Sequence, residues 1–318
     1  MRAFMVKKEC IFSEGDTVEE VLFSERDRTR EQILGVLSRT RDILALPNVV
    51  HEILEVTSGK NSSASDLTNI IESDPALTSK ILAVANSAYY GFVKKISSIS
   101  HAVVILGFRE IQNIALSMSV LQLFDRKGTV FNEQLWRHSF AVGVGTRMVA
   151  GHLGLKLDGK YFVAGLLHDV GKIFLSQYLP DMFGRVLSIL EMQDNTYTYH
   201  SLEEWIFGLS HSDIGGRLLS SWLFPPEIVN AVSHHHQPSM SEHEPVFSAC
   251  VHIADLLCSI KGITPLNDQF FLTLDADILP VVAGYREGFG SEDMHRLLAQ
   301  LDTEIERQSS FVSAFKRT

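Results

Sequence analysis

Apolar residues recur at helical spacing along most of this 318-residue chain, and this feature restricts the possible folds more than any other. Residues 19–43 carry apolar side chains at helical intervals between charged ones, and residues 291–313 form a second clear amphipathic stretch. Patterns typical of strands are weak, with residues 10–12 and 270–274 as the best candidates. The sequence therefore predicts an all-α protein.

Capping residues and polar turns divide the helical pattern into segments. Asp74 followed by Pro75 predicts a helix start, because aspartate can cap a helix and proline suits its first position. Ser65 and Ser100 are the expected N-caps of two short helices. The polar residues 126–129 predict a domain boundary, after which a second helical block extends from about residue 132 to residue 260.

The charge balance bears on the class of partner. With 38 acidic and 28 basic residues the formal net charge is −10, whereas general nucleic-acid binders usually carry a basic excess. A helix–glycine–helix segment around Gly107 superficially resembles a helix-turn-helix. Its second helix, over residues 108–120, has a single Arg and a single Glu and offers few groups for bases or phosphates. Nucleic acid is therefore not an expected partner.

Cysteine usage and the apolar runs bear on location. Three scattered cysteines are too few for a disulfide framework, which indicates a reducing compartment. The start of the chain lacks the apolar centre of a secretory signal. The longest apolar runs are far shorter than the roughly 20 residues of a membrane span. A cytoplasmic protein without membrane attachment is expected.

The strongest chemical signal is an adjacent His168-Asp169 pair that follows an apolar helical run. One imidazole nitrogen and one carboxylate oxygen can bind a single cation, and the small Gly171 lets the backbone approach the site closely. Lys172 can then meet an anionic group such as a phosphate. The alternative is an ordinary helix end at which Asp169 caps the helix or pairs with Lys172.

Further ligand-competent residues lie in the same block, because ten of the 13 histidines fall between His138 and His252. Each one alone has a plain alternative, such as a hydrogen-bonded core histidine or a solvated helix end. Buried together, they could satisfy one another through a metal ion. The candidates outside the His168-Asp169 pair are His138, His211, the run His234-His235-His236, and Asp255.

These motifs, in this order, resemble the HDOD branch of the HD superfamily of metal-dependent phosphohydrolases. The resemblance covers roughly residues 30–260, and its specific part is DPALTSKIL followed by NSAYYG. GLLHDVGK resembles the HD superfamily, and supporting matches lie around Leu46-Pro47, Trp136-Arg137-His138-Ser139, His211, His235-His236 and Asp255. It implies two helical lobes, the second similar to an HD phosphodiesterase core. The predicted division is an N-terminal extension (1–29), an N-terminal lobe (30–128), an HD-like metal-site lobe (129–262) and a C-terminal helical extension (263–318).

The resemblance also implies a ligand set. The metal positions of the related HD-GYP phosphodiesterases correspond to His138, His168, Asp169, His211, His235, His236 and Asp255. Gln134 stands where a glutamate would precede His138 by one helical turn, so one or two metal ions are expected rather than three. Nitrogen and oxygen ligands suit iron, manganese, zinc or nickel without distinguishing them. Gln237-Pro238 replaces the signature of a cyclic-dinucleotide phosphodiesterase.

Two functions remain open at this point. The first is a signal-transduction protein that binds metal and acts mainly through an unidentified regulatory protein partner, for which the turn at residues 86–91 is a candidate surface. Packing between the lobes is the favoured alternative for Tyr89 and Tyr90. The second is a phosphohydrolase acting on a phosphate ester, with Asp169 bridging two cations that activate water and Lys172 stabilising phosphoryl charge.

Overall fold

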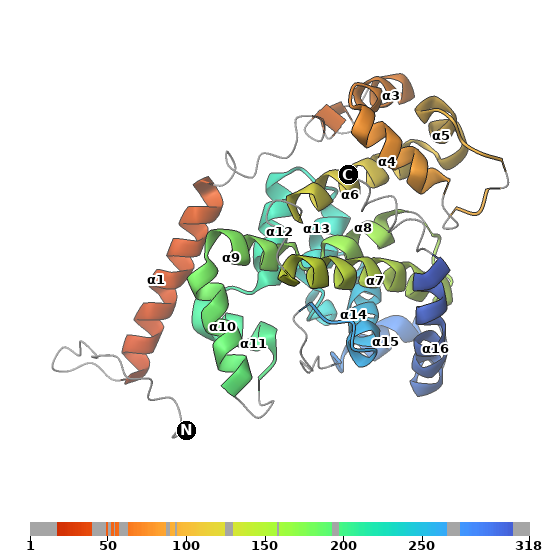
Figure 1. The fold of residues 1–318 in the computed structure, drawn as a ribbon. Helices are drawn as coiled ribbons and strands as arrows, with labels where there is room; N and C mark the ends of the chain where they lie inside the picture. The colour runs from red at the N-terminus through yellow and green to blue at the C-terminus, as the bar shows by residue number, and fades with distance from the viewer. Residues whose placement is uncertain are drawn as a thin grey trace.

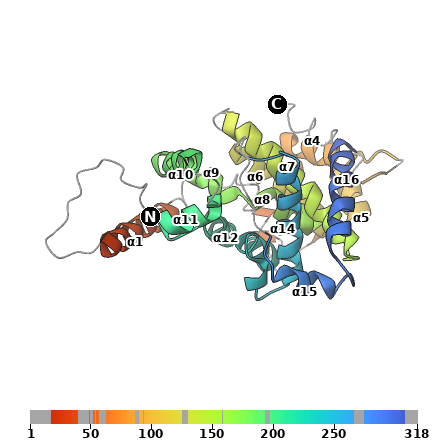
Figure 2. The ribbon, with the colours of Figure 1, turned by 90° about the horizontal axis from the view of Figure 1, so that it is seen from below.

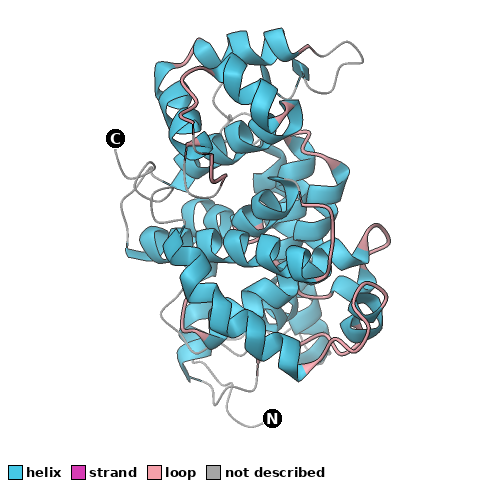
Figure 3. Ribbon diagram, turned by 90° about the vertical axis from the view of Figure 1, so that its right-hand side faces the viewer, coloured by secondary structure: helices cyan, strands magenta, loops and turns pink. Residues whose placement is uncertain are grey.

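The computed structural model describes residues 18–39, 49, 52–53, 55–56, 63–86, 90–92, 94–124, 130–157, 159–192, 197–265 and 274–307. These residues form helices joined by short loops and contain no β-strand (Figure 3). The all-α prediction is therefore confirmed for the described part of the chain. The strand candidate at residues 10–12 and most of the one at 270–274 lie outside it.

The helices of the first lobe start at short polar side chains. Ser63 accepts a hydrogen bond from the backbone N–H of Asp66, and Asp74 accepts from the N–H groups of the two residues after Pro75. Ser98 caps the next helix in the same way. The Asp74 cap was predicted correctly, whereas the caps expected at Ser65 and Ser100 lie two residues earlier. The helices are α3 (Ala64–Glu72), α4 (Pro75–Ala85), α5 (Ile99–Leu106) and α6 (Phe108–Phe124).

The second lobe is built around a long central helix, α7 (Val130–His152), which packs against α8 (Gly159–Leu167) and α14 (Pro245–Ile260) (Figure 2). Close approach depends on glycine, because a Cβ on Gly165 would lie 2.7 Å from the Val142 carbonyl oxygen of the central helix. The other helices of this lobe are α9 (Val170–Tyr178), α10 (Pro180–Met192), α11 (Tyr199–Phe207), α12 (His211–Ser221) and α13 (Pro226–Ser233), with a 3-10 turn η2 (Pro238–Met240).

Contact between the lobes uses the segment that was a candidate partner surface. Tyr90 is half-buried and its hydroxyl donates to the carboxylate of Glu110 on α6. That carboxylate reaches the first residue of α8, since a Cβ on Gly159 would lie 2.6 Å from a Glu110 oxygen. Tyr90 also lines a small cavity together with Phe162 and Val163 of α8, so it packs between the lobes, as favoured. Tyr89 lies outside the described residues.

Helix α1 (Val18–Arg39) lies against α11 of the second lobe (Figure 1). Its Ile33 is fully buried, and Arg26 and Arg30 pack over Gly208 at the end of α11. Gly208 adopts a left-handed conformation, with φ of 65°, and its missing Cβ leaves room for the Arg26 side chain. Helix α1 is continuous across residues 29 and 30, and the predicted division into domains stays a prediction.

The C-terminal helix α16 (Ser291–Arg307) docks on α7 through a polar cluster. Asp293 accepts hydrogen bonds from His152 at 2.7 Å and from Arg286 at 2.8 Å. The short helix α15 (Ile278–Ala283) precedes it, within the predicted C-terminal helical extension. No helix in the described part of the chain is both long enough and apolar enough to cross a bilayer.

Candidate metal centre

The structure brings all seven predicted ligands together in the interior of the second lobe. Five separate segments contribute them: α7, the turn between α8 and α9, the start of α12, the turn after α13, and α14. All are buried except His236, which is half-buried. The cluster consists of His138, His168, Asp169, His211, His235, His236 and Asp255.

One side of the cluster pairs two imidazoles with two carboxylates. The Nε2 atom of His138 lies 3.2 Å from Nε2 of His168 and 3.2 Å from Oδ1 of Asp255. Nε2 of His168 lies 3.5 Å from Oδ2 of Asp169. His138, His168 and Asp169 form one group that could hold a metal ion, and His168, His235 and Asp255 form an overlapping one.

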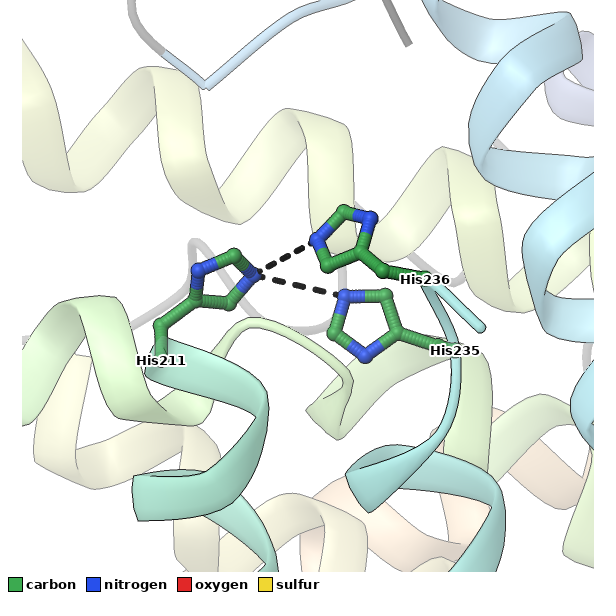
Figure 4. A group of neighbouring side chains, drawn as sticks. All are labelled: His211, His235 and His236. Carbon is green, nitrogen blue, oxygen red and sulfur yellow. Dashed lines mark hydrogen bonds between the residues drawn. The ribbon is translucent and has the colours of Figure 1, made fainter. Parts of the chain in front are cut away.

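The other side of the cluster is a group of three histidines (Figure 4). Nε2 of His211 lies 3.0 Å from Nε2 of His236 and 3.4 Å from Nε2 of His235. Oδ1 of Asp169 lies 3.2 Å from the same His211 nitrogen. The two oxygens of Asp169 therefore face different sides of the cluster, which is the arrangement a bridging carboxylate requires.

The hydrogen bonds of the Nδ1 atoms, on the outer side of the cluster, show that the Nε2 lone pairs of three histidines point to its centre. Nδ1 of His138 lies 2.8 Å from the Ile263 carbonyl oxygen, and Nδ1 atoms of His168 and His235 lie 2.7 Å from the carbonyl oxygens of Gly165 and Val232. A carbonyl oxygen only accepts, so each Nδ1 carries a proton and each neutral ring presents an Nε2 lone pair to the centre. Such outer hydrogen bonds are typical of metal-binding histidines.

Acceptors therefore outnumber the protons available to them at the centre of the cluster. A second proton, on Nε2 of His138, would satisfy the contact with Asp255. The His168 lone pair and the carboxylate of Asp169 would still lack a donor between them. Oδ1 of Asp169 is buried, and the polar contact that it makes is with Nε2 of His211 at 3.2 Å, itself a proposed metal donor. A cation satisfies these groups together, so the donor set fits a divalent metal ion.

Burial and charge set the protonation states. Burial lowers the pKa of His168, His235 and His236, which are neutral donors at neutral pH. Burial opposes ionisation of Asp169, but its interactions with the neighbouring His168, Lys172 and His211 side chains hold the pKa of Asp169 well below its usual value. The cluster therefore offers an ionised carboxylate beside neutral imidazoles, as metal coordination needs.

Lys172 lies against this carboxylate. Its Nζ atom is 2.8 Å from Oδ2 of Asp169 and 5.1 Å from the centroid of the Tyr199 ring. Asp169 occupies the N-cap position of α9 without a side-chain capping bond. The ion pair expected of a plain helix end is thus present, but it lies within the histidine cluster.

Glu203 on α11 is a buried residue that the sequence did not single out. Its Oε2 atom accepts hydrogen bonds from both the backbone N–H, at 2.9 Å, and the ring Nδ1 of His211. It therefore fixes the orientation of His211 from outside the cluster. The segment around it, Leu202-Glu203-Glu204, resembles an ordinary solvated helix face, so the sequence carries no signal for this role.

Replacing Glu203 with Ala should weaken metal binding by about 10–100-fold, the range for outer partners of metal-binding histidines. The reason is that the His211 ring loses its acceptor and can rotate. The dissociation constant of Co²⁺, measured by competition with a chelator, is the readout. Glu203→Gln keeps one acceptor oxygen, so its dissociation constant should lie between those of the parent and Glu203→Ala. Affinity equal to that of the parent in Glu203→Ala would contradict this role.

Metal affinity should rise with pH. Burial lowers the pKa of His211, but the Glu203 carboxylate and the contact with Asp169 together outweigh burial and raise it overall, so a proton stays on this ring to higher pH. A cation must displace that proton, so the affinity increases as pH rises from about 6 to about 8. The same chelator competition at both pH values measures the trend. Affinity independent of pH would show that His211 carries no proton to displace.

The sequence matches the model of one protein family. A model of the HDOD domain matches residues 43–238. An uncharacterised protein of Treponema pallidum is 28% identical over 233 residues, which span 70% of this chain and 44% of that protein. The chain thus spans less than half the length of this relative.

Solved structures share the fold. An HDOD domain protein of unknown function from Geobacter sulfurreducens is 24% identical, with a TM-score of 0.68 over 91% of this chain and 99% of that one. A candidate phosphohydrolase from Shewanella amazonensis is 20% identical, with a TM-score of 0.66 over 88% of this chain and 97% of that one. The all-helical architecture is therefore shared with proteins of this kind.

Proposed function

Because the chain belongs to the HDOD family, we propose that it is a signal-transduction protein whose second lobe holds one or two divalent metal ions and which acts mainly through a regulatory protein partner. His138, His168, Asp169 and Asp255 would hold one ion. His211, His235 and His236 would hold the other, with Asp169 between them. Iron, manganese, zinc and nickel all suit this donor set.

The convergence of buried acceptors carries the metal part of this proposal. The His138 and His168 rings face each other with Nε2 atoms 3.2 Å apart, although both donate their Nδ1 protons to carbonyl oxygens. Bringing two lone pairs together in the protein interior is unfavourable unless a positive charge lies between them. Asp169, whose Oδ1 atom lies 3.2 Å from Nε2 of His211, supplies the bridging acid.

The closed surroundings of the cluster favour signalling over turnover. Structural metal sites are enclosed by protein ligands, whereas catalytic sites keep a position open to substrate. Asp169 is 1% exposed, and His168, His211 and His235 are fully buried. The half-buried His236 is the cluster residue that meets a cavity.

Phosphate-ester hydrolysis is the second candidate, favoured by the position of Lys172. Its ammonium group beside Asp169 can neutralise a phosphoryl oxygen. A bound metal ion would supply hydroxide at neutral pH. Asp169 would orient the ions, and the His236 side of the cluster would admit the ester.

Elemental analysis of the purified protein, followed by a phosphodiester assay with the same metal, separates these functions. Stoichiometric metal without turnover is the expected result. Metal with turnover would support the hydrolase instead. Absence of metal after incubation with each of the four candidate ions would refute the metal centre.

A further inference from the structure

A cavity of about 1080 Å³ lies beside the histidine group of Figure 4. Helix α12, helix α13 and the segment 234–243 form most of its wall, α11 adds His200 and Glu204, and α1 adds Leu34, Leu37 and Ser38. Of the seven clustered residues, His236 alone contributes to its lining as the structure describes it. Anything that reaches the cations from this cavity therefore has to pass His236.

A second histidine, His200 on α11, stands at the same place. It lines the cavity, and its side chain is 11% exposed. Its ring centroid lies 4.4 Å from that of His236 and 6.1 Å from that of His211. At the first of these distances the two rings are in contact, and no phosphate oxygen fits between them.

His200 is held in this position by its own helix. It is the second residue of α11, directly after a capping box in which the Thr198 hydroxyl accepts from the N–H of Ser201. Glu204, one turn later, lies on the outer side, with its Oε2 atom 3.8 Å from the His200 Nδ1 atom. The packing of α1 on α11 adds a further restraint.

His200 does not belong to the ligand set. The ring nitrogens that lie close enough together to share a metal ion on this side are those of His211, His235 and His236. His200 therefore contacts one proposed ligand ring without adding a donor atom to it.

We propose that His200 blocks the cavity side of the His211–His235–His236 group and keeps small oxyanions, phosphate and phosphate monoesters among them, away from the cation there. This inference rests on the proposed metal centre. Lys172 lies close enough to act electrostatically on both His200 and His236, and its ammonium group stands over the ring of Tyr199. A cation and an ammonium group together favour a phosphate oxyanion once the way is open.

The test uses the full chain loaded with Co²⁺ and titrated with inorganic phosphate. Binding is followed by the visible absorption of Co²⁺ and by calorimetry. His200→Ala should bind phosphate at least about tenfold more tightly than the parent, which corresponds to about 1.4 kcal/mol, with unchanged cobalt content. His200→Asn, also smaller than histidine, should change affinity in the same direction. His200→Phe keeps the bulk of the ring and should resemble the parent.

His234→Ala is the matched control, because His234 also lines the cavity while its Nδ1 atom is directed at the Asn230 carbonyl oxygen. Its phosphate affinity should equal that of the parent. Weaker or unchanged phosphate binding in both His200→Ala and His200→Asn would overturn the blocking role, and loss of cobalt in them would make His200 a ligand. A parent chain that binds no cobalt would refute the metal centre and this inference with it, so the two failures are distinguishable.

Discussion

Asp169→Asn should lose metal binding almost completely. Its two oxygens face both sides of the cluster, so the amide removes the negative charge that both proposed cation positions share. The affinity should fall by more than about 100-fold, beyond the range for outer partners of metal-binding histidines. Metal content after dialysis, determined by elemental analysis, measures this. Any phosphoester hydrolysis by the parent should disappear with the metal.

Asp302→Asn is a matched control, because it removes a largely exposed carboxylate that pairs with Lys261 and belongs to none of the groups that could hold a metal ion. It should retain the metal content of the parent. If Asp169→Asn also kept its metal, or kept full turnover, Asp169 would not be the bridging ligand.

Gly171→Ala should lower the free energy of unfolding strongly, and by much more than the glycine-to-alanine substitution at Gly184. A Cβ at this position would lie 2.0 Å from the backbone carbonyl oxygen of His211, so α9 and α12 would have to separate. Overpacking of this kind costs typically 1–3 kcal/mol and here should reach about 3 kcal/mol or more, because backbone cannot yield as a side chain does. The melting temperature of the metal-free chain should fall by roughly 4–5 °C or more, because the shift per kcal/mol decreases with chain length.

Gly184→Ala provides the comparison within a helix. A Cβ on Gly184 of α10 meets nothing within 4 Å, so the substitution should leave the melting temperature unchanged or raise it slightly. Equal melting temperatures for Gly171→Ala and the parent would show that the contact between α9 and α12 is looser than the structure indicates.

Helix starts that depend on a few neighbouring residues could be predicted from the sequence, whereas those that depend on tertiary packing could not. Asp74-Pro75 specified a helix start unambiguously, because capping and proline act within a few residues. At Ser98 and Ser100, either serine can cap, and the choice depends on how far the helix extends when packed. The same ambiguity exists at Ser63 and Ser65, where the structure uses Ser63 as the N-cap.

The site shows the same distinction. The seven residues were proposed together because their motifs resemble a family, and the structure places them in one cluster. Glu203 and His200 were not anticipated. Each lies in a helix whose charged and polar residues resemble a solvated face. Only the tertiary structure, in which α11 packs on α1 and α10 and Glu203 bonds His211, buries Glu203 and places His200 against His236.

The positions of Asp255 and Ile263 affect where this chain can be shortened. Both follow residue 238, at which the family match ends, and α1 precedes residue 43, at which it begins. A chain trimmed to the matched segment would leave His138 without its carboxylate neighbour and without the carbonyl that orients its ring. It would also remove the α1 wall of the cavity. A segment that keeps the proposed metal centre together with its cavity therefore extends beyond residues 43–238 at both ends.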